Sequence, residues 1–239
     1  MNKDKIYNIV RLLTCLVFFF SIGSLTNLIF KVFNFDKNNM NVFDNVLYSF
    51  VVSLFLFILL FFMYKDTIKK DFYNFRNNKK TYINYTVKMF IIFIIVKYFV
   101  GIICSLIMNF MGIDSTYMVS NNQNLIEQYV KNAPILMFIS VSILGPFYEE
   151  CIFRLGFRKV IDNKFAYIII SGTLFGILHV FPLSEGVTLP IGLIQSVSYV
   201  VMGCFFSYIY YKNNNIFISI ILHFLNNFIS VLLMLKMLF

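Results

Sequence analysis

Charged residues are scarce in this chain of 239 residues, because only 13% are Asp, Glu, Lys or Arg while 59% are hydrophobic. Soluble domains contain about a quarter charged residues, so a compact fold of this composition could not cover its surface with solvated side chains. Glycine, proline and cysteine are also few, with 10, 4 and 4 residues. These counts exclude collagen-like repeats, disordered chains and disulfide-rich scaffolds. We therefore expect a membrane protein, whose partner over most of its surface is the lipid bilayer.

The four cysteines show no CxxC spacing, and each lies in or beside an apolar stretch. They are Cys15, Cys104, Cys151 and Cys204. This distribution indicates neither a disulfide framework nor a zinc knuckle, so we expect these residues to serve in packing.

The apolar runs of the sequence are long enough to cross about 30 Å of hydrocarbon as helices. Seven spans are expected, at 12–33, 44–64, 83–110, 134–157, 165–181, 190–211 and 216–238. An eighth helix, re-entrant or interfacial, fits in the loop at 115–132. The predicted fold class is therefore all-α, a polytopic transmembrane bundle with about seven to eight helices, without a soluble domain or an internal repeat.

Positive charge orients this bundle, because Lys and Arg concentrate in cytoplasmic loops. The loop at 65–80 carries six basic residues, whereas the loop at 111–133 carries only Lys131. Basic residues return after the fourth span and in the loop before the last one. The alternation predicts a multi-pass protein of the cell membrane with a cytoplasmic N-terminus. Since loops account for the net charge of +9, we expect no nucleic-acid partner.

A few ionisable residues nevertheless lie inside the predicted spans, where a charge costs about 2.5–3.5 kcal/mol at the helix centre. Glu149 and Glu150 are adjacent in the fourth span, and the two histidines of the chain, His179 and His223, lie in later spans. A lone membrane histidine is ordinarily explained by an interhelical hydrogen bond. An acidic pair and both histidines on three helices instead predict that these side chains converge on one site.

The acidic pair has a basic neighbour at helical spacing. Glu150 and Arg154 are four residues apart, so their charges can partly cancel on one helix face. Glu149 points about 100° away from Glu150 and is free for a different task. The alternative is that both acids only neutralise Arg154. Lys97, within the third span, is interpreted as a snorkelling or ion-paired residue.

The histidines also have partners one helical turn away. Phe175 precedes His179 on the same face, and Asn227 follows His223. A histidine and an asparagine stacked on an otherwise apolar helix form a pair of hydrogen-bond donors or ligands.

These residues form three motifs, EExxxR, FxxxH and HxxxN, whose order on successive helices resembles the CPBP family of intramembrane proteases. This family includes CAAX prenyl endopeptidases and bacteriocin-processing or Abi proteins. The motifs stand here as Glu149-Glu150-Cys-Ile-Phe-Arg154, Phe175-Gly-Ile-Leu-His179 and His223-Phe-Leu-Asn-Asn227. The resemblance covers roughly 134–239, which we predict to be the catalytic helical core, while 1–133 supply N-terminal transmembrane helices. In many bacterial members a glycine directly follows the motif arginine, whereas here Leu155 precedes Gly156.

We expect this protein to be bacterial. The resemblance also implies a role for each motif residue. Glu149 would be the general base that activates the hydrolytic water, and His179 would help to hold or polarise that water. His223 and Asn227 would bind the substrate carbonyl oxygen as it gains negative charge. The supporting residues would be Glu150, Arg154 and Phe175.

A metal is left open by these residues, because two histidines and a carboxylate also form a zinc ligand set. If zinc or another divalent metal is bound, the expected ligands are His179, His223 and Glu149. The sequence contains no HExxH motif, and the resemblance favours glutamate-activated water without a required metal.

Three functions are compatible with these features. The first is an intramembrane endopeptidase whose partner is a peptide or protein substrate at the membrane. The alternative within the same family is a non-catalytic bacteriocin immunity or membrane scaffold protein. A small transporter or proton relay would more often contain repeated helices broken by Gly or Pro. The complete motif set favours the endopeptidase, because a silent binder has no need of Glu149, His223 and Asn227 together.

Overall fold

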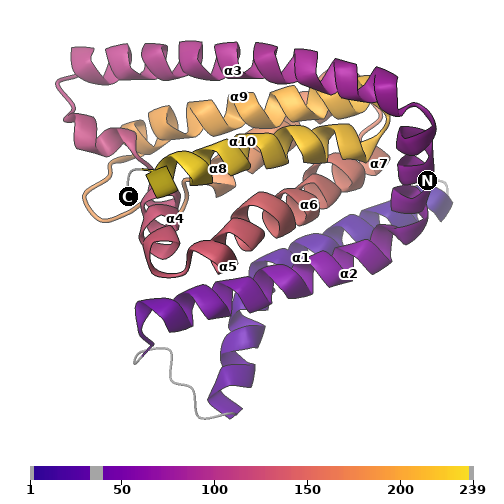
Figure 1. Ribbon diagram of the computed structural model, residues 1–239, viewed down its shortest axis with the longest axis horizontal. Helices are drawn as coiled ribbons and strands as arrows, with labels where there is room; N and C mark the ends of the chain where they lie inside the picture. Colours follow the sequence, from indigo (N-terminus) through magenta and orange to yellow (C-terminus); the bar gives the residue numbers. More distant parts are fainter. Residues whose placement is uncertain (1–2, 33–39, 237–239) are drawn as a thin grey trace.

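The computed structural model describes residues 3–32 and 40–236, in which helices are joined by turns and loops (Figure 1). In chain order the helices are α1 (Lys3–Val32), α2 (Val42–Asn77), α3 (Lys79–Phe110), α4 (Asn121–Asn132), a continuous helix at Pro134–Val160, α8 (Lys164–Leu178), α9 (Leu189–Asn213) and α10 (Ile216–Lys236). The continuous helix contains α5 (Pro134–Phe138), α6 (Gly145–Glu150) and α7 (Phe157–Val160). The predicted all-α fold is confirmed, and α4 occupies the loop in which an eighth helix is expected. Only the ends of two predicted spans, 33 and 237–238, lie outside the described residues.

Five helices in the described part of the chain are long and apolar enough to cross a membrane. They are α2, α3, the Pro134–Val160 helix, α9 and α10. Helix α8 is apolar but has only 15 residues, so it is shorter than the span predicted at 165–181. It ends at Leu178, and His179 forms its C-terminal cap. The chain is therefore a membrane protein, and one of its two histidines lies at a helix end.

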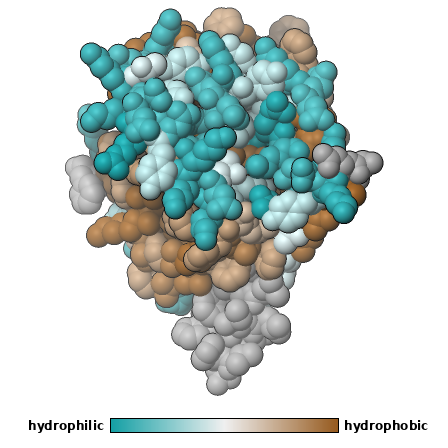
Figure 2. All heavy atoms as spheres, turned by 90° about the vertical axis from the view of Figure 1, so that its right-hand side faces the viewer, coloured by the Kyte–Doolittle hydropathy of each residue, from teal (hydrophilic) through white to brown (hydrophobic). Residues whose placement is uncertain are grey.

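In Figure 1, α3, the Pro134–Val160 helix, α9, α10 and most of α2 lie along the long axis of the molecule, whereas α4 lies across it. Helix α10 contacts α9, α3, α2 and the Pro134–Val160 helix, so it is the central element of the bundle. Figure 2 shows that hydrophilic side chains gather on the end of the molecule where the α2–α3, α7–α8 and α9–α10 turns lie. We predict that this end faces the cytoplasm. Helices of 1–133 pack directly on those of 134–239, and the proposed division between these regions stays a prediction.

Helices α8 and α9 approach each other closely at two glycines. A Cβ atom built on Gly203 of α9 would lie 2.6 Å from the backbone oxygen of Gly172 in α8. A Cβ atom on Gly172 would in turn lie 2.5 Å from the backbone nitrogen of Cys204. Small residues allow such close contacts between membrane helices. The contacts at Gly172 and Gly203 position α8 beside the rest of the bundle.

Replacing Gly203 with Ala is expected to lower the free energy of unfolding by about 1–3 kcal/mol, because the added methyl group forces the two backbones apart. Titration of the purified protein with SDS in mixed micelles measures this change. Gly101→Ala is the matched control, since nothing lies within 4 Å of a Cβ atom at that position. Equal stability of the two variants would show that the contact between α8 and α9 has been misplaced.

The Pro134–Val160 helix contains two π-helical turns, which the apolar pattern of the sequence does not predict. They cover Ile139–Leu144 and Cys151–Gly156, on either side of α6 (Gly145–Glu150). Pro146 lacks an N–H group, and its ring crowds the carbonyl four residues earlier, so the wide turn before it accommodates the proline. Such π-turns are rare and occur frequently at functional sites. Here they bracket the helical segment that carries the acidic pair.

The start of α10 is held by Asp71 of α2. The Ile216 backbone N–H donates to Asp71 Oδ2 at 3.0 Å, and Asn215 Nδ2 donates to the Asp71 backbone oxygen at 2.9 Å. A carboxylate at a helix N-terminus satisfies a free N–H group and interacts favourably with the helix dipole. This contact fixes the position along the bundle at which His223 lies.

Candidate active site

The predicted convergence of the acidic pair and the two histidines is present in the structure. Glu149 Oε2 lies 3.7 Å from His179 Nε2 and 3.8 Å from His223 Nε2. The side chains of Glu149 and His179 are 15% and 19% exposed, whereas that of His223 is 2% exposed. The two imidazoles therefore approach the same carboxylate oxygen from α10 and from the end of α8.

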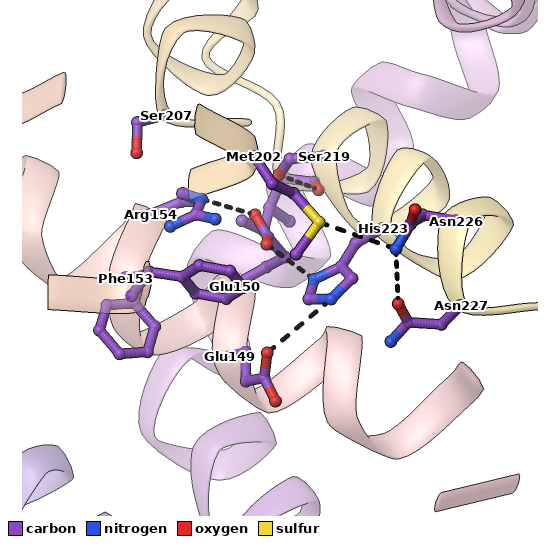
Figure 3. Close-up of polar contacts among 12 residues, drawn as sticks. Glu149, Glu150, Phe153, Arg154, Met202, Ser207, Ser219, His223, Asn226 and Asn227 are labelled. Carbon is purple, nitrogen blue, oxygen red and sulfur yellow. Dashed lines mark hydrogen bonds and ion pairs between the residues drawn. The ribbon is translucent and has the colours of Figure 1, made fainter. Parts of the chain in front are cut away.

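Glu150 has different neighbours from Glu149, although the two residues are adjacent (Figure 3). Glu150 Oε2 lies 2.9 Å from Arg154 Nε, and Glu150 Oε1 lies 3.0 Å from His223 Nδ1. The side chains of Glu150 and Arg154 are fully buried. Glu150 thus connects the motif arginine to the motif histidine of α10, while Glu149 faces the space between the histidines.

Arg154 is enclosed by aromatic and hydroxyl groups. Its guanidinium carbon lies 4.9 Å from the centre of the Phe175 ring, and Nη1 lies 3.4 Å from Ser171 Oγ. Ser171 Oγ itself donates to the Phe153 backbone oxygen at 2.6 Å. The aromatic face and the hydroxyl group replace part of the water that a buried guanidinium group loses. Phe175 accordingly contacts the supporting ion pair.

The hydrogen bond at Nδ1 sets the orientation of each imidazole. His223 Nδ1 donates to Glu150 Oε1, since a carboxylate accepts, and His179 Nδ1 donates to the Phe175 backbone oxygen at 2.8 Å. Both rings consequently turn Nε2 toward Glu149. Phe175 orients His179 in a second way, because the two ring centres are 4.3 Å apart.

Tyr199 of α9 lies at the site but is absent from the three sequence motifs. Its ring stacks on His179 with 5.0 Å between centres, and its hydroxyl lies 3.0 Å from Ser120 Oγ at the start of α4. The sequence offers no motif that marks this tyrosine among 15 tyrosines. It links the imidazole of His179 to the segment that covers the site.

A cavity of about 600 Å³ opens at these residues. The motif side chains in its wall are Glu149, His179, His223 and Asn227. Residues of α4 also line the cavity. The segment that leads into α4 is held by Gln195, whose Nε2 donates to the Tyr117 backbone oxygen at 2.6 Å. A cavity of this size is within the range that accommodates small ligands or a few residues of a peptide.

Asn227 belongs to a chain of polar contacts that leads away from the motif residues. Its Nδ2 donates to the Val141 backbone oxygen at 2.8 Å, and its Oδ1 accepts from Asn226 Nδ2 at 2.9 Å. Lys97 Nζ of α3 donates to Asn226 Oδ1 at 2.7 Å. Lys97 therefore contacts an amide oxygen in the cavity wall, where we expected a snorkelling or ion-paired residue. In the sequence, the position of this lysine within an apolar span is the feature that indicates a polar partner.

The structure describes no group of three or more His, Cys, Asp or Glu side chains arranged to hold a metal ion. Metal–ligand bonds of zinc to nitrogen or oxygen are about 2.0–2.2 Å long, so its ligands crowd around one point. Glu149, His179 and His223 form the predicted ligand set, and their oxygen and nitrogen atoms are not gathered this closely around one point. Their role as metal ligands stays a prediction, and we derive no step through a metal.

Comparison with known proteins connects this geometry to a family. Residues 131–229 match the family model described as type II CAAX prenyl endopeptidase Rce1-like, and all three motifs lie inside that range. A protein of Mycoplasma capricolum subsp. capricolum, described as uncharacterized, is 29% identical over 237 residues. The match covers 93% of this chain and 65% of the relative, so the chain spans about two thirds of that protein's length. No solved structure matches the chain.

Proposed function

We propose that this chain, whose residues 131–229 match the type II CAAX prenyl endopeptidase Rce1-like family model, is an intramembrane endopeptidase. The observation that carries the proposal is the position of Glu149 Oε2, between two histidine Nε2 atoms at the wall of a cavity. The substrate is a peptide or a protein segment that enters this cavity from the membrane. The family name is not by itself evidence that the substrate is prenylated.

Glu149 activates the water in the first step. The 3.7 Å between Glu149 Oε2 and His179 Nε2 exceeds a hydrogen bond, and one water molecule can bridge groups at such a separation. His179 donates through Nδ1, so the lone pair of its neutral Nε2 can accept a hydrogen bond from this water. The Glu149 carboxylate accepts the other proton while the water oxygen attacks the substrate carbonyl carbon.

His223 and Asn227 stabilise the negative charge that the carbonyl oxygen then gains. His223 Nδ1 donates to Glu150 Oε1, and a proton on Nε2 lets the same ring donate to the oxyanion. Asn227 Nδ2 carries two protons, of which one is used on the Val141 backbone oxygen and one is free. Preorganised donors of this kind lower the barrier without reorganisation during the reaction.

Collapse of the tetrahedral intermediate completes the hydrolysis. The carbon–nitrogen bond breaks, and the Glu149 carboxyl group returns its proton to the leaving amine. The products are a new amine and a new carboxylic acid, which contains the water oxygen with its second proton and then ionises to a carboxylate. Glu149 is then ionised again and ready for another cycle.

The test of this proposal is cleavage of defined peptides by the purified full chain in detergent. The probes are short apolar peptides and peptides with a prenylated cysteine before an aliphatic C-terminal tripeptide, with products identified by mass spectrometry. We expect cleavage at one bond, at a rate unchanged by preincubation with EDTA. If no probe is cut and the protein nevertheless protects cells against a bacteriocin, the non-catalytic immunity function replaces the proposal. Loss of cleavage with EDTA that zinc restores would contradict the proposed mechanism.

A further inference from the structure

Lys97 carries a charge near the middle of α3, in one of the apolar helices that can cross the membrane. A lysine is expensive at such a position and usually has a function there. Its Nζ donates to Asn226 Oδ1 at 2.7 Å, and it lines the same cavity as Glu149 and Asn227. The mechanism proposed above assigns it no role. The contact with Asn226 connects it to Asn227, which does have one.

The hydrogen bonds from Lys97 to the Val141 carbonyl all run in one direction. Lys97 Nζ donates to Asn226 Oδ1, Asn226 Nδ2 donates to Asn227 Oδ1, and Asn227 Nδ2 donates to the Val141 backbone oxygen. Figure 3 shows the side chains of Asn226 and Asn227 beside His223. The contacts at 2.7, 2.9 and 2.8 Å are all of normal hydrogen-bond length.

The groups at the two ends of this series of hydrogen bonds, Lys97 Nζ and the Val141 carbonyl, fix that direction. An ammonium group has three donors and no acceptor, and a backbone carbonyl oxygen only accepts. An asparagine amide has a donor end and an acceptor end, so it could otherwise sit in either of two orientations. If Asn226 were reversed, its Nδ2 would face the Lys97 ammonium, donor against donor. Lys97 at one end and Val141 at the other therefore select the same orientation for both amides.

We propose that Lys97 is a positioning residue that sets the orientation of the Asn227 amide through Asn226. The proposal rests on the proposed function, in which Asn227 donates to the oxyanion. In the selected orientation the free proton of Asn227 Nδ2 is available to the substrate carbonyl oxygen, whereas the reversed amide would present Oδ1. An oxygen there would repel the oxyanion. The lysine thus keeps a donor at the site without touching the substrate.

Three variants separate this role from packing and from charge. Lys97→Met removes the donor and keeps a long unbranched side chain. Lys97→Arg keeps a side chain that only donates. Asn226→Asp keeps a partner for Lys97 but cannot donate to Asn227 Oδ1. Lys88→Met is the matched control, because Lys88 lies on the same helix and lines a separate shallow pocket.

Kinetics on a peptide that the wild type cleaves give the first readout. We expect kcat to fall about 10- to 100-fold in Lys97→Met and in Asn226→Asp with KM nearly unchanged, since the lost contact is one that forms in the transition state. Lys97→Arg and Lys88→Met retain kcat. A merely structural lysine would instead leave kcat intact in Asn226→Asp, whose contact with Lys97 is maintained. That result would overturn the proposal.

A second readout does not depend on catalysis. The side-chain amide of Asn227 is observed by NMR in the full chain labelled with 15N-asparagine, and Asn227→Asp assigns the signal. We expect one unchanged pair of amide proton signals in Lys97→Arg and shifted or doubled signals in Lys97→Met and Asn226→Asp. An Asn227 signal that is identical in all variants would overturn the positioning role. If no peptide is cleaved the proposed function fails, and this measurement still decides whether Lys97 orients Asn227.

Discussion

Replacing Arg154 with Met is expected to lower the free energy of unfolding by about 3–5 kcal/mol, because the buried Glu150 carboxylate would then lose its arginine partner. Both side chains are fully buried, and 2.9 Å separates Arg154 Nε from Glu150 Oε2. Methionine retains much of the volume beside Phe175, so the loss is mainly electrostatic. SDS titration in mixed micelles, followed by circular dichroism, measures the change.

The control for this prediction is Arg76→Met, at an exposed position in the last turn of α2, which should change stability by less than about 0.5 kcal/mol. The double variant Glu150→Gln with Arg154→Met should recover a large part of the loss, since it removes both charges. An Arg154→Met variant as stable as Arg76→Met would mean that the pair is not desolvated as the structure places it. No recovery in the double variant would assign the loss to packing.

Replacing Glu149 with Gln is expected to reduce kcat for peptide cleavage by about 10²–10⁴-fold, because glutamine cannot accept the proton of the attacking water. The change should leave the fold intact. Glutamine has the same shape as glutamate, and both histidine Nε2 atoms lie beyond hydrogen-bond distance from Glu149 Oε2. Single-turnover cleavage of a probe peptide measures the effect.

Glu127→Gln is the matched control for Glu149, because Glu127 pairs with Lys131 on the exposed side of α4. It should cleave at the wild-type rate. Glu150→Gln provides a second contrast, since it should reduce stability as well as activity by disturbing the contacts with Arg154 and His223. Wild-type cleavage by Glu149→Gln would remove Glu149 from the role of base.

The convergence of the acidic pair and the histidines could be predicted because charge is scarce within the spans. Each ionisable side chain in an apolar helix needs a polar partner. The predicted spans contain few such partners for Glu149, His179 and His223 other than these three residues themselves. The spacing of Glu150 and Arg154 likewise predicted their pairing, which the structure contains at 2.9 Å. Periodicity and length also predicted the all-α fold.

The contacts that complete the site depend on tertiary packing and could not be read from spacing. Nothing in the sequence places Tyr199 against His179, because aromatic residues occur throughout the spans. The contact from Lys97 to Asn226 joins residues 129 positions apart, so no helical periodicity relates them. The early end of α8 and the two π-helical turns arise from backbone geometry that apolar patterning does not encode.

In the proposed mechanism, water activated at Glu149, and not a side-chain nucleophile, attacks the peptide bond. Ser140 lines the same cavity, and its buried hydroxyl has no hydrogen-bond partner among the described residues, so a serine mechanism is the direct competitor. The decisive measurement is mass spectrometry of both the intact protein and the product after a single turnover in 18O-labelled water. We expect a protein of unchanged mass throughout the turnover and one 18O atom in the new carboxylate. A protein that transiently gains the mass of the N-terminal peptide fragment, and loses it to hydroxylamine, would show that a side chain and not water attacks the substrate.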